Sequence, residues 1–153
     1  MSDLSDDIND LVKYFKIIDK KNQDAILGTR FSKKSKITNY PIFKLLINRL
    51  ANNLIKIIFF SDYNDFTNAF KIYKRKTLLR LFPLVSESFN IFLELPLKII
   101  NRNYSYSVIP INWNGRKYGI SKFKIKEMGS MYIFTLMYCF LEKILLNKNN
   151  KKN

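Results

Sequence analysis

The chain has 153 residues, of which 27 are Lys or Arg and 12 are Asp or Glu, with one cysteine and no histidine. This length is enough for one domain with a buried core. The single Cys139 excludes an intrachain disulfide. The lack of histidine excludes Ser-His or Cys-His catalysis and His-ligated zinc. The net charge of +15 favours an anionic partner, either a phosphate-bearing substrate or a membrane surface. Nucleic acid is not the expected partner, because the charge is mostly lysine and nucleic-acid recognition relies more on arginine.

Helical and strand patterns alternate along the chain. In chain order they predict a helix over 8–18, a strand over 25–29 and a helix over 42–60. A strand over 70–73 and two helices, over 75–82 and 89–100, follow. The last predicted elements are a strand over 105–113 and a helix over 124–146. Asp6 or Asp7 suits the N-cap of the first helix, and Pro41 suits the first turn of the second. Helices alternating with short strands indicate the α/β class.

The last predicted helix is strongly apolar. Residues 131–146 contain Glu142 and Lys143 and form a short stretch for a membrane span, so we do not predict a transmembrane helix there. Its aromatic residues either pack on the domain or lie in a membrane interface. We expect residues 147–153, a Lys/Asn tail, to be disordered.

Five segments combine charged, polar and glycine residues in patterns that suit phosphate chemistry. They are Asp3-Leu4-Ser5-Asp6-Asp7, Gly28-Thr29-Arg30-Phe31, Asp65-Phe66-Thr67-Asn68-Ala69-Phe70-Lys71, the helix over 89–98 with Glu94, and Arg116-Lys117-Tyr118-Gly119-Ile120-Ser121-Lys122. In this order they resemble the second half of a family 2 glycosyltransferase of the dolichol- or polyprenyl-phosphate sugar synthase type. The resemblance covers roughly residues 1–146. It implies an incomplete GT-A-like α/β fold over these residues, the C-terminal half, with a mixed sheet and flanking helices.

The acidic start of the chain suits a hard divalent cation, because Mg²⁺ and Mn²⁺ prefer carboxylate oxygens. By resemblance, Asp3 is the second carboxylate of a DxD element that reaches Mg²⁺ or Mn²⁺ on a nucleotide-sugar diphosphate, and Ser5 lies near the same metal. The first aspartate of that element falls at Met1, which is a departure from the family. Asp6 and Asp7 have a second interpretation, as the N-cap and first-turn charges of the helix that follows.

Five further residues are assigned to substrate binding by the resemblance. Arg30 and Lys44 would hold phosphate oxygens, and Arg116, Ser121 and Lys122 would close over the diphosphate or over the phosphate of the acceptor. The last three lie in a basic loop that contains glycine, which lets a phosphate approach the backbone closely.

Asp65 and Glu94 are the candidate catalytic carboxylates. A lipid-phosphate acceptor is already an anion and needs no strong base, but a hydroxyl acceptor would need one of these carboxylates to take its proton. Each also has a structural interpretation, Asp65 as the cap of a turn and Glu94 as a satisfied carboxylate inside an apolar helix.

The family begins with a nucleotide-binding half that residues 1–153 do not contain. The sequence therefore leaves two interpretations: a truncated glycosyltransferase, whose missing half is supplied as a separate chain, or a catalytically inactive remnant or basic membrane-peripheral interaction module. The partners that the resemblance implies are a nucleotide-sugar donor, a lipid-phosphate or sugar acceptor and a membrane surface. The implied location is cytoplasmic, peripheral at the membrane face.

Overall fold

The computed structural model describes residues 6–115 and 125–150. In chain order the elements are α1 (Ile8–Lys20), β1 (Ala25–Thr29), β2 (Ile37–Thr38), α2 (Ile42–Phe59), β3 (Lys71–Tyr73), α3 (Arg75–Arg80), α4 (Ile91–Asn101), β4 (Tyr106–Pro110), β5 (Trp113–Asn114) and α5 (Ile125–Asn150). Every predicted helix and strand is present, and Asp7 is the N-cap of α1, its side chain accepting a hydrogen bond from the backbone N–H of Asn9 at 2.9 Å. The α/β class is confirmed.

The strands form two small sheets. The larger has the order β3-β1-β4, in which β1 runs antiparallel to β3 and parallel to β4. The smaller pairs β2 with β5 in parallel, joining Ile37 to Trp113. Strand β2 lies between β1 and α2, where no strand was predicted, and β5 lies at the end of the predicted strand over 105–113, which is interrupted after Pro110. The mixed sheet with flanking helices agrees with a partial GT-A-like fold.

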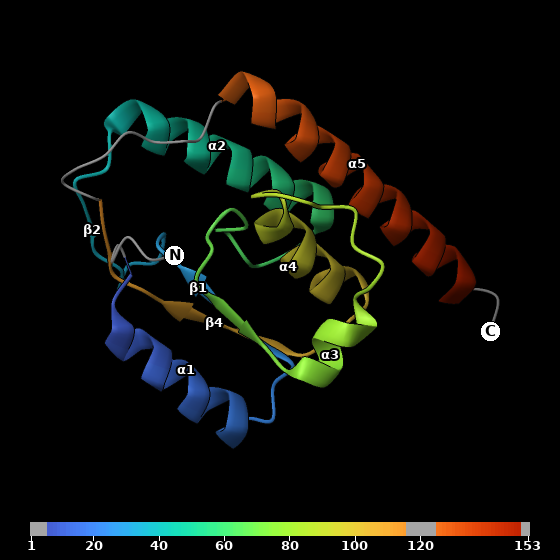
Figure 1. The fold of residues 1–153 in the computed structure, drawn as a ribbon, viewed down its shortest axis with the longest axis horizontal. Helices are drawn as coiled ribbons and strands as arrows, with labels where there is room; N and C mark the ends of the chain where they lie inside the picture. The colour runs from blue at the N-terminus through green and yellow to red at the C-terminus, as the bar shows by residue number, and fades with distance from the viewer. Residues whose placement is uncertain (1–5, 116–124, 151–153) are drawn as a thin grey trace.

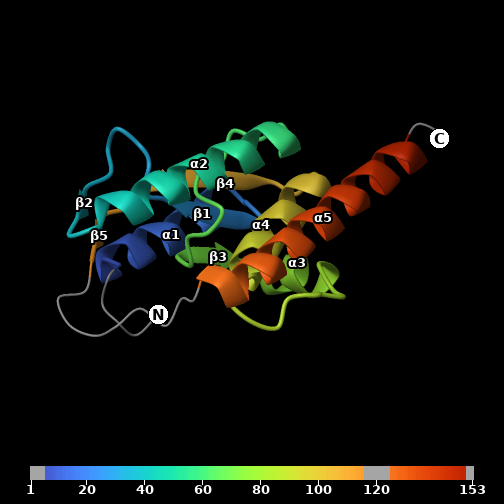
Figure 2. The same ribbon diagram turned by 90° about the horizontal axis from the view of Figure 1, so that it is seen from above.

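Helices cover both faces of the larger sheet (Figures 1 and 2). Successive side chains of a strand point to opposite faces, so Ile26 of the fully buried β1 packs with Tyr14 and Ile18 of α1. Ala25 and Leu27 point the other way, into the larger core. That core also contains side chains from α2, α4 and α5: Ile55, Phe59, Leu93, Leu97 and Cys139.

Helix α5 ends later than predicted, and its apolar segment is longer than the predicted one. It continues past Leu146 to Asn150, where a disordered tail was predicted, and Lys148 in its last turn is favourable at the negative end of the helix dipole. Its segment Gly129–Leu146 is also long and apolar enough, by length and composition alone, to cross a membrane. This segment begins two residues before the stretch of 131–146 considered in the sequence, and 11% of it is buried in the protein.

Candidate functional site

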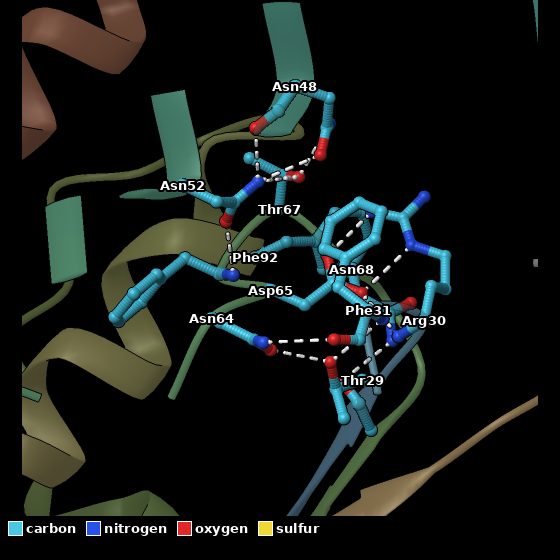
Figure 3. A network of polar contacts seen from close by, with 12 residues as sticks. Thr29, Arg30, Phe31, Asn48, Asn52, Asn64, Asp65, Thr67, Asn68 and Phe92 are labelled. Atoms are coloured by element: carbon cyan, nitrogen blue, oxygen red, sulfur yellow. Dashed lines mark hydrogen bonds and ion pairs between the residues drawn. The ribbon is translucent and has the colours of Figure 1, made fainter. Parts of the chain in front are cut away.

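Arg30, the residue directly after β1, forms a buried ion pair with Asp65. Its Nε and Nη2 donate to the two carboxylate oxygens of Asp65 at 2.9 and 2.7 Å, and its backbone N–H donates to the same carboxylate at 2.8 Å. Arg30 is 8% exposed and the Asp65 side chain is fully buried. The second and third predicted segments, 35 residues apart in sequence, thus meet at the end of β1 (Figure 3).

Three aromatic rings surround the guanidinium group of Arg30. They belong to Phe31, Tyr40 and Trp113, with centroids 5.2, 5.9 and 6.0 Å from the guanidinium carbon. A cation is attracted to the faces of such rings, more so where water is excluded. Although burial opposes it, the Asp65 pair raises the pKa of Arg30, so this charge is permanent.

The turn that carries Asp65 is fixed to α2 by a chain of side-chain amides (Figure 3). The Oδ1 of Asn52, a fully buried residue, accepts from the backbone N–H of Phe66 at 2.6 Å. Asn48, one helical turn earlier, donates to the hydroxyl of Thr67 at 3.0 Å. Asn68 donates to the carbonyl of Gly28 at 2.9 Å, which ties the turn back to β1. The turn is thereby held between a strand and a helix.

The side chain of Lys71 also stabilises this turn, through hydrogen bonds to backbone carbonyls. Its ammonium donates to the carbonyls of Phe66 at 2.9 Å, of Asn68, and of Phe92 at 3.0 Å. Phe92 lies four residues before Pro96 in α4, and proline has no N–H for that carbonyl. Lys71 therefore satisfies the carbonyl that Pro96 leaves free, which explains how a proline is accommodated inside a buried helix. Burial lowers the pKa of Lys71 to about 7, although the charge of Asp65 opposes this shift.

Gly28 lies where β1 is in close contact with the side chain of Tyr14 and the backbone of Phe70. A Cβ added there would lie 2.2 Å from the hydroxyl of Tyr14 and 2.7 Å from the carbonyl oxygen of Phe70. Tyr14 is fully buried and its ring packs against Phe70, with centroids 5.1 Å apart, so neither group has room to retreat. The glycine of the Gly28-Thr29-Arg30 segment is thus required by packing.

We expect Gly28→Ala to lower the free energy of unfolding by about 1–3 kcal/mol, the usual cost of overpacking a core. Urea titration followed by circular dichroism measures this change. Gly129→Ala is the matched control, because nothing lies within 4 Å of an added Cβ at Gly129 in α5 and alanine is the better helix former. A Gly28→Ala variant as stable as the wild type would contradict the packing argument.

Glu94 lies in a second buried ion pair, inside α4. Its carboxylate is 3.0 Å from the ammonium of Lys98, and both side chains are fully buried. It also accepts from the backbone N–H groups of Val85 at 3.0 Å and Ser86 at 2.8 Å. Burial by itself raises the pKa of Glu94, but the hydrogen bonds from Ser86, Val85 and Lys98 outweigh it and hold that pKa below its usual range.

Each of the two predicted catalytic carboxylates is therefore engaged by a cation of its own. Asp65 holds Arg30 and Glu94 holds Lys98, each within hydrogen-bonding distance of its own cation. These contacts favour the structural interpretation of both residues over a role as a proton acceptor.

A shallow cavity of about 250 Å³ lies beside β2 and β5, and the first residues of the described chain also line it. It is lined by Asp6, Asp7, Lys36, Thr38, Asn112, Trp113 and Asn114. Asp6 pairs with Trp113 in an isolated antiparallel bridge. Since β5 closely follows the carboxyl end of the parallel strand β4, the cavity lies where open α/β sheets commonly bind ligands.

The remaining predicted site residues lie either on the surface of α2 or outside the described part of the chain. Lys44 is exposed in the first turn of α2. The other five lie outside the described residues, and they are Asp3, Ser5, Arg116, Ser121 and Lys122. Within residues 6–115 and 125–150 no group of three carboxylate or thiol side chains is arranged to hold a metal ion. Two carboxylates, Asp6 and Asp7, line the cavity, and Mg²⁺ is usually held in proteins by one or two carboxylates together with substrate phosphates.

Sequence reasoning missed three residues that build this region: Asn52, Lys98 and Trp113. Asn48 and Asn52 are spaced i, i+4 in α2, and Glu94 and Lys98 have the same spacing in α4. Polar pairs at this spacing share a helix face, which was a usable signal for both. Trp113 carried no comparable local signal.

Known proteins offer one informative similarity. The chain is 25% identical over 118 residues to a polyprenol monophosphomannose synthase from Mycolicibacterium smegmatis. It is a distant relative of this glycosyltransferase. The match covers 69% of the chain and 44% of the synthase, so the chain spans less than half the length of its relative. No family model matches the sequence. No solved structure matches it either.

Proposed function

We propose that this chain serves the transfer of a sugar from a nucleotide-sugar to a polyprenyl phosphate or a similar phosphorylated lipid. The distant relationship to a polyprenol monophosphomannose synthase supports this class of reaction. The observation that favours a phosphate acceptor over a hydroxyl acceptor is the pairing of Asp65 with Arg30 and of Glu94 with Lys98. A hydroxyl acceptor needs a base to take its proton, and both candidate bases are engaged in buried ion pairs.

The chemistry of a phosphate acceptor fits that arrangement. An oxygen of the lipid phosphate forms a bond to the anomeric carbon of the sugar, while the bond from that carbon to the nucleotide diphosphate breaks and the diphosphate leaves as an anion. The nucleophile is already charged, so the protein contributes placement and neutralisation of charge. In this proposal Lys44, Arg116, Ser121 and Lys122 supply the donors to phosphate oxygens. Arg30 orients the turn and the aromatic rings around it.

The cavity beside β5 suggests how two distant segments serve one site. Asp6, the first described residue, pairs with Trp113, which lies shortly before the basic loop that begins at Arg116. The acidic segment and the basic loop are therefore continuous along the chain with residues that line the same cavity. We propose that Asp3 contributes to a Mg²⁺ or Mn²⁺ site and that Ser5 supports it.

The acceptor is tested by co-flotation with neutral vesicles containing polyprenyl phosphate. We expect binding that weakens with salt, because the phosphate is recognised by charge, and that falls by about tenfold in Arg116→Ala/Lys122→Ala, the effect of about 1.4 kcal/mol. Lys33→Ala/Lys34→Ala removes the same charge from two exposed positions between β1 and β2 and is the matched control. Equal losses in both double variants, or equal binding to vesicles without polyprenyl phosphate, would show that the basic loop does not recognise the head group.

The second interpretation is a catalytically inactive, basic membrane-peripheral module, and the exposed apolar surface of α2 and α5 favours it as much as it favours an enzyme. Transfer of radiolabelled mannose from a nucleotide-mannose to polyprenyl phosphate, assayed over the common nucleotides with Mg²⁺ or Mn²⁺ present, separates the two. Either function places the protein at the cytoplasmic face of a membrane in our proposal.

A further inference from the structure

The larger sheet ends on both sides in a strand with one neighbour. Within residues 6–115 and 125–150 it has three strands, of which β3 and β4 are the outer ones (Figure 2). Sheets of about four to six strands are the most common. An outer strand carries backbone N–H and C=O groups that point away from the sheet and can pair with a further strand. The direction of these groups shows which edge can accept one.

Strand β3 directs four polar backbone groups away from the sheet. At its two ends, the carbonyl of Phe70 accepts from β1 at 3.2 Å, and the N–H of Lys74 donates to the residue before β1 at 2.9 Å. Bonded and non-bonded residues alternate in an antiparallel pair. Ile72 is therefore a bonded residue, whereas the N–H and C=O groups of Lys71 and Tyr73 face the outer edge.

Strand β4 is less suited to pairing at its own outer edge. The carbonyl of Ser105 and the N–H of Ile111, on either side of β4, bond to β1 at 3.2 and 3.0 Å. The alternation makes Tyr106, Val108 and Pro110 the residues whose backbone groups point outward. Proline has no N–H, and a proline at the edge of a sheet hinders pairing with another strand. The edge of β3 is therefore the one that can extend the sheet.

The charge around β3 indicates which kind of strand would pair there. Residues 69–81 contain five cations and no carboxylate. Two of these cations, Arg75 and Lys76, are exposed at the start of α3, directly after β3. A second copy of this chain would bring the same cations together, and each copy carries a net charge of +15. Like charges oppose such a pairing, whereas a strand flanked by carboxylates would neutralise the cations.

We propose that the outer edge of β3 accepts a strand of a second polypeptide, an α/β partner whose strand is flanked by carboxylates. The inference rests on the proposed function, because the match covers 44% of the synthase and the partner would supply the part outside it. Main-chain hydrogen bonds to Lys71 and Tyr73 would provide affinity, and the charges would provide specificity. Since the side chain of Lys71 bonds to the carbonyl of Phe66, the added strand would lie close to the turn that carries Asp65.

Hydrogen exchange of single backbone amides, followed by NMR, tests this pairing in the full chain. The chain is measured alone and after co-expression with the part of the Mycolicibacterium smegmatis synthase outside the match. We expect fast exchange at Lys71 and Tyr73 in the chain alone, and exchange slower by about tenfold or more in the complex. Ile72 is the internal control, because its N–H bonds to β1 and is expected to be protected in both states.

The charge of the partner is tested with Arg75→Glu/Lys76→Glu. We expect the amount of chain recovered with a tagged partner to fall by about tenfold, because the attraction becomes a repulsion. Lys33→Glu/Lys34→Glu is the matched control, since it makes the same change of charge at exposed positions after the opposite end of β1 and is expected to have no effect. Circular dichroism verifies that both variants keep the fold.

Two results would overturn the proposal. In one, the amides of Lys71 and Tyr73 are already protected in the chain alone, which would mean that this chain, or a second copy of it, covers the edge. In the other, they stay unprotected when the partner is joined to the chain by a Gly/Ser linker, which makes the association intramolecular. A protected edge in a complex that transfers no mannose would contradict the proposed function and leave the pairing intact.

Discussion

Replacing Asp65 with Asn is expected to lower the free energy of unfolding by about 3–5 kcal/mol, the range found when one member of a buried ion pair is removed. The carboxylate accepts three hydrogen bonds from Arg30, and the guanidinium is only 8% exposed. Asparagine has nearly the same shape, so the loss comes from leaving a buried cation without a counter-charge. Urea unfolding followed by tryptophan fluorescence measures it, because Trp113 lies near Arg30.

Asp62→Asn is the matched control, since Asp62 lies in the same loop but is exposed, and a change within about 0.5 kcal/mol is expected there. A double variant, Arg30→Met/Asp65→Leu, removes both charges and is expected to recover part of the loss. If Asp65→Asn changed stability no more than Asp62→Asn does, the pair would not be the fixed contact described here. Recovery in the double variant distinguishes the charge effect from a simple packing defect.

Lys98→Met is expected to cost a similar amount, about 3–5 kcal/mol, because it leaves Glu94 buried without its cation. The ammonium of Lys98 also donates to the carbonyls of Leu81, at 3.2 Å, and of Pro83, so the loop after α3 loses two contacts as well. The change is measured by urea titration at neutral pH. Lys13→Met tests the same substitution in the pair of Lys13 with Asp10. There the lysine side chain is 61% exposed, although the Asp10 side chain is only 3% exposed, so we expect a smaller loss than in Lys98→Met, where both side chains are buried.

The pH dependence of stability reports on Glu94 directly. The pKa of Glu94 in the folded protein is below the usual range. The stabilisation that ionised Glu94 contributes is therefore complete above the ordinary carboxyl pKa, and it is lost as the pH falls through the pKa of the folded state. Lys98→Met removes one of the interactions that lower this pKa, and we expect the acid-induced loss of stability to begin at a higher pH. The free energy of unfolding measured from pH 3 to pH 7 for the wild type and the variant shows the shift. Parallel curves would mean that Lys98 does not set the ionisation of Glu94.

Local signals in the sequence predicted most of the helices and strands, although not β2 or the break between β4 and β5. The short apolar run at residues 25–29, the N-cap at Asp7 and the apolar run after Pro41 led to β1, α1 and α2 with nearly correct bounds. The resemblance also named Gly28 and Asp65, which both lie in the region built around the end of β1. These conclusions required only the neighbours of each residue along the chain.

Only the tertiary structure decided what those residues contact. The sequence offered Asp65 and Glu94 as bases, yet each lies beside a cation, Arg30 from a distant strand in one case and Lys98 one turn along the helix in the other. Pro96 lies inside α4, and Lys71 from β3 donates to the carbonyl of Phe92 that this proline leaves without a donor.

The orientation of α2 is the clearest case. Its apolar residues surround much of the helix, so periodicity alone does not select a buried side. Packing of Ile55 and Phe59 and the hydrogen bond from Phe66 to Asn52 select it. Burial of a polar amide is favourable only where its partner is in place, and that partner comes from a turn that the fold, and not the local sequence, brings to the helix.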